Sequence, residues 1–224
     1  MCGRYSLTTP VEALRRVFGF EGSPNLAARY NIAPTQEAPV LRRHPDGRLL
    51  CHGLRWGLIP SWAKDMSGAA RMINARAETV AEKPAFRAAF GRRRCLVPAD
   101  GFYEWQKLDG GAKQPWRIVM ADRGPFAFAG LWERWEHPED GKIDSFTIIT
   151  TDAAPQIREI HHRMPVILDP AAHASWLDPE AGRDDLLALL RPNEGVDAYR
   201  VDARVGNVRN DDAGLIEPVG DAKG

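Results

Sequence analysis

Residues 95–105 have the sequence CLVPADGFYEW, an apolar and aromatic run that contains Pro98, Asp100 and Gly101. Runs of this kind, bounded by Gly, Pro and Asp, are typical of β-strands. Comparable runs occur at residues 39–43, 49–60, 115–121, 126–135, 145–151 and 164–168. They outnumber the helical segments and do not alternate regularly with them. The sequence therefore predicts an α+β fold with a mostly antiparallel, barrel-like β-sheet and a few flanking helices.

Four segments favour helices. Residues 10–18 begin with a proline after Thr9 and continue with apolar residues at helical spacing. Residues 78–90 indicate a second helical region, interrupted near Pro84, and residues 169–177 and 184–190 indicate two more. No linker divides the chain. We therefore expect one domain over residues 1–224, with a frayed tail at about residues 219–224.

The bulk composition is that of an ordinary globular domain, with 44% hydrophobic and 27% charged residues. No apolar run is long enough to predict a membrane span, and the N-terminus lacks the pattern of a secretion signal. We therefore expect a cytoplasmic protein that binds no membrane. Thirty basic residues balance thirty acidic ones, which disfavours non-specific coating of nucleic acid but allows a local basic groove. The consecutive arginines at residues 92–94 are interpreted as a solvated face.

The three cysteines are Cys2, Cys51 and Cys95, and no two of them have CxxC spacing. This pattern predicts neither a disulfide framework nor a zinc ribbon. Cys51 and Cys95 lie in apolar, strand-like runs, so both are expected in the core. We expect a monomer that needs no metal and no cofactor.

Cys2 follows a methionine that ordinary processing can remove, because cysteine is a small residue. Removal would leave an α-amine and a thiol on one residue, with reference pKa values of about 8 and 8.5. Such a 1,2-aminothiol condenses with an aldehyde to an imine, and the thiol then closes a five-membered thiazolidine ring. An internal cysteine cannot do this, because its nitrogen is an amide. Position alone does not decide between this chemistry and a cysteine without a role.

Three polar residues lie within apolar or aromatic stretches: Asn74, Glu104 and His161. Glu104 lies between Tyr103 and Trp105, where desolvation can raise the carboxyl pKa and suit it to acid–base catalysis. His161 can transfer protons near neutrality. Each residue also has a structural interpretation. Glu104 fits a paired sheet residue, Asn74 a turn or cap, and His161 a hydrogen-bonded core histidine.

Six stretches together resemble the SOS response-associated peptidase (SRAP) family. They are MCGRY at 1–5, YNIAPTQ at 30–36, WGLIPSWAK at 56–64, NARAET at 74–79, RRCLVPADGFYEW at 93–105 and HHRMPVIL at 161–168. The stretches occur in family order over about three quarters of the chain. The resemblance implies a sensor of abasic sites in single-stranded DNA that cross-links to them and shields them at replication forks, within the nucleoid.

The resemblance also implies catalytic roles. Cys2 is the nucleophile, and Asn74 orients the N-terminus and the sugar. Glu104 transfers protons during Schiff-base formation and removal of Met1. His161 acts as acid and base on the ring-opened deoxyribose, and the adjacent His162 can share that role.

Six residues near these motifs are expected to bind DNA. The predicted phosphate ligands are Arg4, Arg76 and Arg163, and the predicted base-stacking residues are Trp56, Trp62 and Trp105. For Trp62, a place in the core is an equal alternative.

The residues leave other functions open. A cysteine peptidase would use the Cys2 thiolate with His161 as base, although self-removal of Met1 is the only proteolysis that the residues suggest. A non-catalytic DNA-binding module would not need Cys2. An imine that fails to close its ring can promote β-elimination, which is lyase activity. Blocking the α-amine separates a thiazolidine former from a peptidase, and a denaturation-resistant DNA adduct excludes the non-catalytic module.

Overall fold

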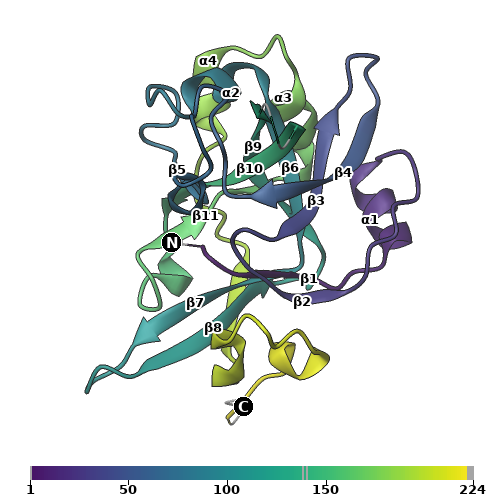
Figure 1. Cartoon of the computed structure of the whole chain (residues 1–224). Coiled ribbons are helices and arrows are strands. Elements are labelled where there is room, and N and C mark those ends of the chain that lie inside the picture. The colour runs from purple at the N-terminus through teal and green to yellow at the C-terminus, as the bar shows by residue number, and fades with distance from the viewer. Residues whose placement is uncertain (1, 138, 140, 221–224) are drawn as a thin grey trace.

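A closed five-stranded barrel forms the centre of the protein, for which we describe a computed structural model of residues 2–137, 139 and 141–220 (Figure 1). Every strand pairs antiparallel with its neighbours except β4 and β10, which are parallel. The predicted α+β fold with a barrel-like sheet is confirmed. The strands are β3 (Glu37–Arg43), β4 (Leu49–Trp56), β6 (Arg94–Ala99), β9 (Phe126–His137) and β10 (Gly141–Asp152).

Three short strands extend the barrel. These are β5 (Asn74–Arg76), β11 (Arg163–Pro165) and β12 (Ile167–Leu168). The C-terminal half of β10 carries β5 on one side and β11 on the other, so that Thr150 is in register with both Arg76 and Pro165. This register places the NARAET and HHRMP stretches on the two sides of β10.

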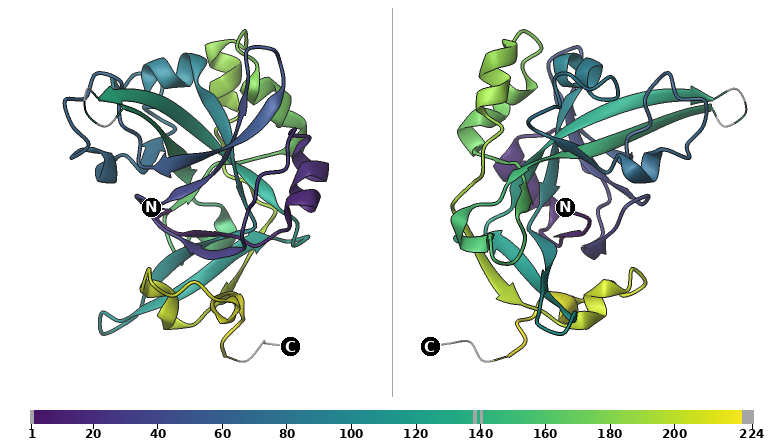
Figure 2. Two further views of the ribbon diagram at one scale, coloured as in Figure 1. Left: turned by 45° about the vertical axis from the view of Figure 1, so that its right-hand side comes forward. Right: turned by 90° about the vertical axis from the view of Figure 1, so that its left-hand side faces the viewer.

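A second sheet has the order β13-β8-β7-β1-β2 and is antiparallel throughout. It joins the two ends of the chain, because the first and last strands of the sequence belong to it. The strands are β1 (Tyr5–Leu7), β2 (Arg29–Ile32), β7 (Gly101–Lys107), β8 (Lys113–Met120) and β13 (Val196–Arg200). In Figure 2 this sheet lies across one end of the barrel.

The run at residues 95–105 divides at Asp100 and enters both sheets. The Asp100 carboxylate accepts hydrogen bonds from Ser6 Oγ at 2.7 Å and from Arg117 Nη2 at 3.1 Å, which ties β1 and β8 to the point where the chain changes sheets. Gly101 is required there, because a Cβ atom would lie 2.5 Å from Arg117 Nε. Asp100 and Gly101 therefore anchor the strand that leads to Glu104.

Helices are short and lie outside the barrel. The helix α1 (Val11–Phe18) has the predicted bounds and ends at Gly19, whose φ of +69° suits glycine. The others are α2 (Arg87–Arg92), α3 (His173–Leu177), α4 (Arg183–Ala188) and the 3₁₀ turns η1 (Ala69–Arg71), η2 (Pro155–Ile157), η3 (Pro170–Ala172), η4 (Ala203–Gly206) and η5 (Ala213–Ile216). None of the helices among the described residues has the length and apolar character needed to cross a bilayer.

Several local expectations were wrong. Residues 78–86 form turns rather than a helix, which begins only at Arg87, because Pro84 interrupts the segment and lacks a backbone N–H. Arg94 is buried rather than solvated, and its guanidinium donates to the carbonyl groups of Phe90, Gly91 and Trp176 at 2.7–2.8 Å. Cys95 is buried as expected, whereas Cys51 is only half-buried.

The expected tail is only partly described. The N–H of Val219 donates to the carbonyl oxygen of Arg200 at 2.9 Å, so the chain is still attached to β13 at that point. Residues 221–224 lie outside the described residues.

Candidate functional site

Cys2 and Glu104 come from neighbouring segments of the second sheet. Tyr5 on β1 is opposite Phe102 on β7, and the N–H of Tyr103 donates to the carbonyl oxygen of Arg4 at 3.0 Å. The segment that begins at Cys2 therefore runs antiparallel along the strand that carries Glu104. Both side chains are buried, with exposed fractions of 0% for Cys2 and 4% for Glu104.

Burial changes the acid–base properties of both groups. Burial raises the pKa of the Cys2 thiol far above its ordinary value, and the negative charge of Glu104 raises it further. Burial also raises the pKa of Glu104 to about 7. Glu104 can therefore both accept and donate a proton near neutral pH, whereas the buried thiol stays protonated.

Asn74 contributes an acceptor from the barrel edge. Its Nδ2 donates to the carbonyl oxygen of Ile73 at 3.0 Å, which fixes the orientation of the amide. The Oδ1 atom is buried, and it accepts no hydrogen bond from the described residues. Leaving a buried acceptor unsatisfied costs about 1–3 kcal/mol. This geometry suits a carboxamide that accepts a hydrogen bond from a ligand or an amine.

His161 follows η2 and is held by the backbone of Arg163. Its Nδ1 lies 3.0 Å from the N–H nitrogen and 3.0 Å from the carbonyl oxygen of that residue. A neutral imidazole can accept from the N–H, and a protonated one can donate to the carbonyl, so the ring keeps a partner in both states. Burial lowers the pKa of His161, which favours the neutral form at pH 7. The ring of His162 stacks on it at 4.5 Å and is exposed.

Arg163 braces the edge strands. Its guanidinium makes a two-pronged ion pair with Glu78, at 2.6 and 3.0 Å, and contacts Asp152 at 2.8 Å and the carbonyl oxygen of Thr150 at 2.7 Å. The side chain is only 10% exposed. Glu78 belongs to NARAET and Arg163 to HHRMP, so this ion pair holds the two stretches together. The guanidinium is thus occupied by two carboxylates rather than directed toward solvent.

Arg4 is held in a different way. Its Nη1 donates to Asn31 Oδ1 at 2.8 Å and to the carbonyl oxygen of Val205 at 2.7 Å, and its Nη2 donates to Gly206 at 3.2 Å. The guanidinium carbon also lies 5.8 Å from the centroid of the Trp105 ring. These partners are neutral, so Arg4 is positioned while its charge remains available to an anion.

Asn31 is a buried residue to which the sequence analysis assigned no role. Its Nδ2 donates to the carbonyl oxygens of Val205, Asn207 and Asn210 at 2.8–3.2 Å. Asn31 therefore links Arg4 to a C-terminal strap, which we define as residues 201–219. Asn31 lies in the YNIAPTQ stretch, but the acceptors of its Nδ2 are more than 170 residues away in sequence, so local patterns could not reveal this link.

The remaining predicted DNA contacts differ in accessibility. The Arg76 side chain is exposed, and its guanidinium forms no hydrogen bond or ion pair with the other described residues. Trp62 is 65% exposed, which places it outside the core, and Trp105 is partly exposed. Trp56 is fully buried, donates to the carbonyl oxygen of Ile73 at 2.9 Å and packs against Tyr5. Its indole therefore belongs to the core and offers no face to a base.

The structure brings the two halves of the site together. Tyr5 contacts Trp56, which binds the carbonyl group just before Asn74, so β1 is coupled directly to β5. Gln106 on β7 donates to the carbonyl oxygen of Glu159 at 3.4 Å, which couples Glu104's strand to the turn before His161. The described residues contain no group of three or more His, Cys, Asp or Glu side chains suited to a metal ion.

A sequence profile described as "SOS response associated peptidase (SRAP)" matches residues 1–208. The chain belongs to the SRAP family. A relative from Bacillus subtilis strain 168, named abasic site processing protein YoqW, is 42% identical over 97% of this chain and 99% of its own length. The abasic site processing protein HMCES of Pongo abelii is 32% identical over 98% of this chain and 76% of its own length.

Solved structures support the same fold. A crystal structure of a Bacteroides thetaiotaomicron protein matches with a TM-score of 0.87 and 28% identity, over 97% of this chain and all of that one. In the present SRAP chain, Tyr5 of the first stretch and the GFYEW stretch lie on the second sheet, and NARAET and HHRMP contribute β5 and β11 at the barrel edge. The six stretches that suggested the family therefore meet largely at one place.

Proposed function

We propose that this protein recognises abasic sites in single-stranded DNA and forms a thiazolidine with them through Cys2, once Met1 has been removed. The main support is the pairing of β1 with β7, which buries Cys2 beside Glu104 in a chain whose relatives are named abasic site processing proteins. An α-amine, a thiol and a carboxyl group that titrates near pH 7 are the groups that this condensation needs.

The reaction has three steps that balance. The neutral α-amine of Cys2 adds to C1′ of the open-chain aldehyde and gives a carbinolamine. Protonated Glu104 gives its proton to the departing hydroxyl, which leaves as water, and the Glu104 carboxylate then takes the proton of the nitrogen, so that a neutral imine forms. The Cys2 thiol then adds across the C=N bond, so that sulfur bonds to C1′ and its proton is transferred to the nitrogen. The net product is the adduct and one water.

Asn74 and His161 act on the sugar and the amine in this scheme. The free Oδ1 of Asn74 accepts from the α-amine or a sugar hydroxyl, which directs the nitrogen lone pair toward C1′. His161 transfers the proton that opens and recloses the deoxyribose ring, and the two backbone groups of Arg163 keep its ring oriented as it does so. Holding the groups in place supplies much of the rate by raising their effective concentration.

In this proposal the DNA contacts the arginine and tryptophan side chains that solvent can reach. Arg4 and Arg76 bind phosphates, and Trp62 and Trp105 stack on flanking bases. Arg163 does not bind DNA in this scheme but stabilises the segments that carry Asn74 and His161. His162 can share the proton transfers of His161. The protein works as a monomer at replication forks in the cytoplasm, where the adduct shields the lesion.

The alternative of a cysteine peptidase has weaker support. A peptidase needs a thiolate, and burial raises the pKa of the Cys2 thiol and so keeps it protonated. The amine-first reaction does not need a thiolate at its first step. Self-removal of Met1, with Glu104 as the proton-transfer group, and β-elimination at the imine are side activities of the same site.

Intact-mass spectrometry tests the proposal directly. Protein lacking Met1 is incubated with abasic single-stranded DNA, and the expected product has the summed mass less one water and survives denaturation. Acetylation of the α-amine, with the thiol spared, should abolish the product. Full adduct formation by the acetylated protein would contradict amine attack and favour thiol-only chemistry.

A further inference from the structure

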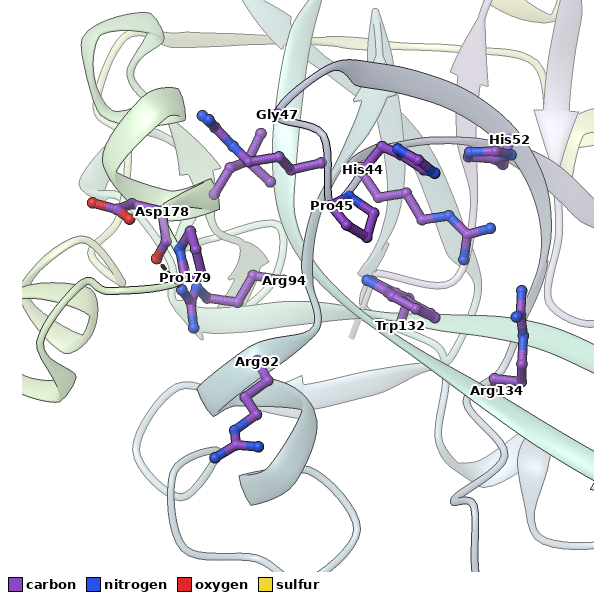
Figure 3. Close-up of a pocket in the computed structure, with 13 residues that line it drawn as sticks. His44, Pro45, Gly47, His52, Arg92, Arg94, Trp132, Arg134, Asp178 and Pro179 are labelled. Atoms are coloured by element: carbon purple, nitrogen blue, oxygen red, sulfur yellow. Dashed lines mark hydrogen bonds between the residues drawn. The ribbon is translucent and has the colours of Figure 1, made fainter.

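A groove on the outside of the barrel shares no residue with the candidate site. It has a volume of about 960 Å³ and lies between the β3–β4 hairpin and β9 on one side and the ends of α2 and α3 on the other (Figure 3). We call it the arginine groove. The lining residues used below are Arg42, Arg43, Arg92, Arg94, Trp132 and Arg134.

The arginine groove concentrates positive charge in a chain whose net charge is zero. Five arginines and two histidines line it, and Asp178 is the one carboxylate among the described lining residues. Arg43 and Arg92 are exposed and form no ion pair within the described part of the chain. Arg94 donates to backbone carbonyl groups and forms no direct ion pair with the other described residues, although the charge of Asp178 lies near it. The groove is therefore an electrostatic site for an anion.

Two of the guanidinium groups are fixed in advance. Asp144 accepts from Arg42 at 2.8 Å and from Arg134 at 2.6 and 2.8 Å, and Arg42 lies 4.5 Å from the centroid of the Trp132 ring. Figure 3 shows Trp132 and Arg134 on one side of the groove, across from Arg94 and Asp178. Because they are already ordered, an anion that binds them loses less side-chain entropy.

We infer that the arginine groove binds the phosphodiester backbone of the DNA that flanks the lesion held at Cys2. This inference rests on the proposed function, because it needs DNA at the candidate site. Guanidinium groups match phosphate oxygens in geometry and charge. They dominate this lining, whereas protein partners are usually anchored by buried aromatic side chains.

Strand β10 sets the distance between the two sites. Its C-terminal half pairs with β5 and β11, and Asp144 lies in its N-terminal half. Six residues separate Asp144 from Thr150, which corresponds to roughly 20 Å of strand. About six base pairs of DNA span that length. Only DNA that extends well beyond the lesion therefore reaches the groove.

The test compares two double variants with equal charge changes. Arg43→Glu with Arg92→Glu alters the groove, and Arg15→Glu with Arg16→Glu alters exposed positions on α1, outside it. Abasic oligonucleotides carry flanks of about three or about fifteen nucleotides, single-stranded or duplex, on either side of the lesion. Initial binding and cross-linking rate are measured over a range of salt, and Tm is recorded for every protein.

Short-flank substrates should react equally with all three proteins. On long flanks the groove variant should bind at least about 10-fold more weakly than wild type at low salt. The slope of log binding constant against log salt concentration should be shallower by about 1.4 on single strands or about 1.8 on duplex, the values for two phosphate contacts. The control variant should match wild type. Equal binding by the groove and control variants on every long flank overturns the inference. Failure of the wild type to cross-link any substrate instead contradicts the proposed function, and binding of intact long DNA still tests the groove.

Discussion

The two halves of the candidate site differ in how their ionisable groups are surrounded. On the second sheet, Cys2 and Glu104 are buried among apolar side chains, and their pKa values are raised because the charged forms are poorly solvated. On the barrel edge, Arg163 is neutralised by Glu78 and Asp152, and the neighbouring cation Arg76 is exposed. The comparison teaches that the proposed proton transfer at Glu104 depends on burial, whereas the proposed phosphate contact of Arg76 depends on exposure, so variants of these two residues should have separate effects.

The largest effect is expected at Cys2. Cys2→Ser keeps the α-amine but removes the thiol, so it should form an imine that borohydride traps and no adduct that survives heating. Denaturing gels with and without borohydride measure both species. A heat-stable adduct formed by Cys2→Ser without borohydride would show that the thiol is not needed.

Glu104→Gln should slow cross-linking by about 10²–10⁴-fold, because the amide cannot transfer the proton. In the wild type the rate should change with pH around 7, where Glu104 titrates, and this feature should be absent in Glu104→Gln. Rates measured from pH 5 to about 9 span the titrations of both the carboxyl group and the α-amine. Retention of the pH 7 feature in the variant would assign it to another group.

The same variant has a predicted effect on stability. The folded-state pKa of about 7 lies above the ordinary 4.5, so the folded protein binds the proton more tightly than the unfolded chain. Stability from this group is complete below pH 4.5 and decreases as the pH rises toward 7. Glu104→Gln should remove that decrease, which denaturant unfolding at several pH values measures.

His161→Ala should slow cross-linking by about 10²-fold or more on natural abasic DNA. On a substrate with a permanently open aldehyde it should largely recover, whereas Glu104→Gln should not. Protein from which Met1 has already been removed is used for both. An equal recovery of the two variants would contradict the assignment of different proton transfers to Glu104 and His161. His162→Ala would then be the matched variant to examine.

The smallest effects are expected at Arg76 and Arg163 on the barrel edge. Replacing Arg76 should affect DNA binding, whereas replacing Arg163 should affect stability. Arg76→Ala should weaken initial DNA binding and reduce the salt slope by about 0.7, the value for one phosphate on a single strand, with Tm unchanged. Arg163→Ala should lower Tm, because it removes the ion pair that joins β11 to the segment after β5. A Tm loss for Arg76→Ala, or none for Arg163→Ala, would contradict the assignment.

The sequence predicted most strands and the helix at residues 11–18, because hydrophobic spacing and terminal signals are local. It did not predict that residues 95–105 divide between two sheets at Asp100, since that depends on hydrogen bonds from Ser6 and Arg117. The burial of Arg94 also depends on a distant partner, the carbonyl group of Trp176 on α3.

The candidate site shows the same limit. The motif stretches predicted roles for Cys2, Asn74, Glu104 and His161, and these roles stay predictions. They could not distinguish the buried Trp56 from the exposed Trp62, because both lie in one WGLIPSWAK stretch. Nor could they identify Asn31, whose acceptors belong to the C-terminal strap.

The C-terminal strap also sets the order of events during synthesis. Arg4 lies two residues after Cys2, yet two of its acceptors, the carbonyl groups of Val205 and Gly206, are 201 and 202 residues further along the chain. A nascent chain therefore exposes its N-terminal cysteine long before the ribosome has made the residues that hold Arg4 in place. Messages cut short before codon 205 yield polypeptides with the thiol but without this support, so translation must pass residues 205 and 206 before Arg4 can be held in place.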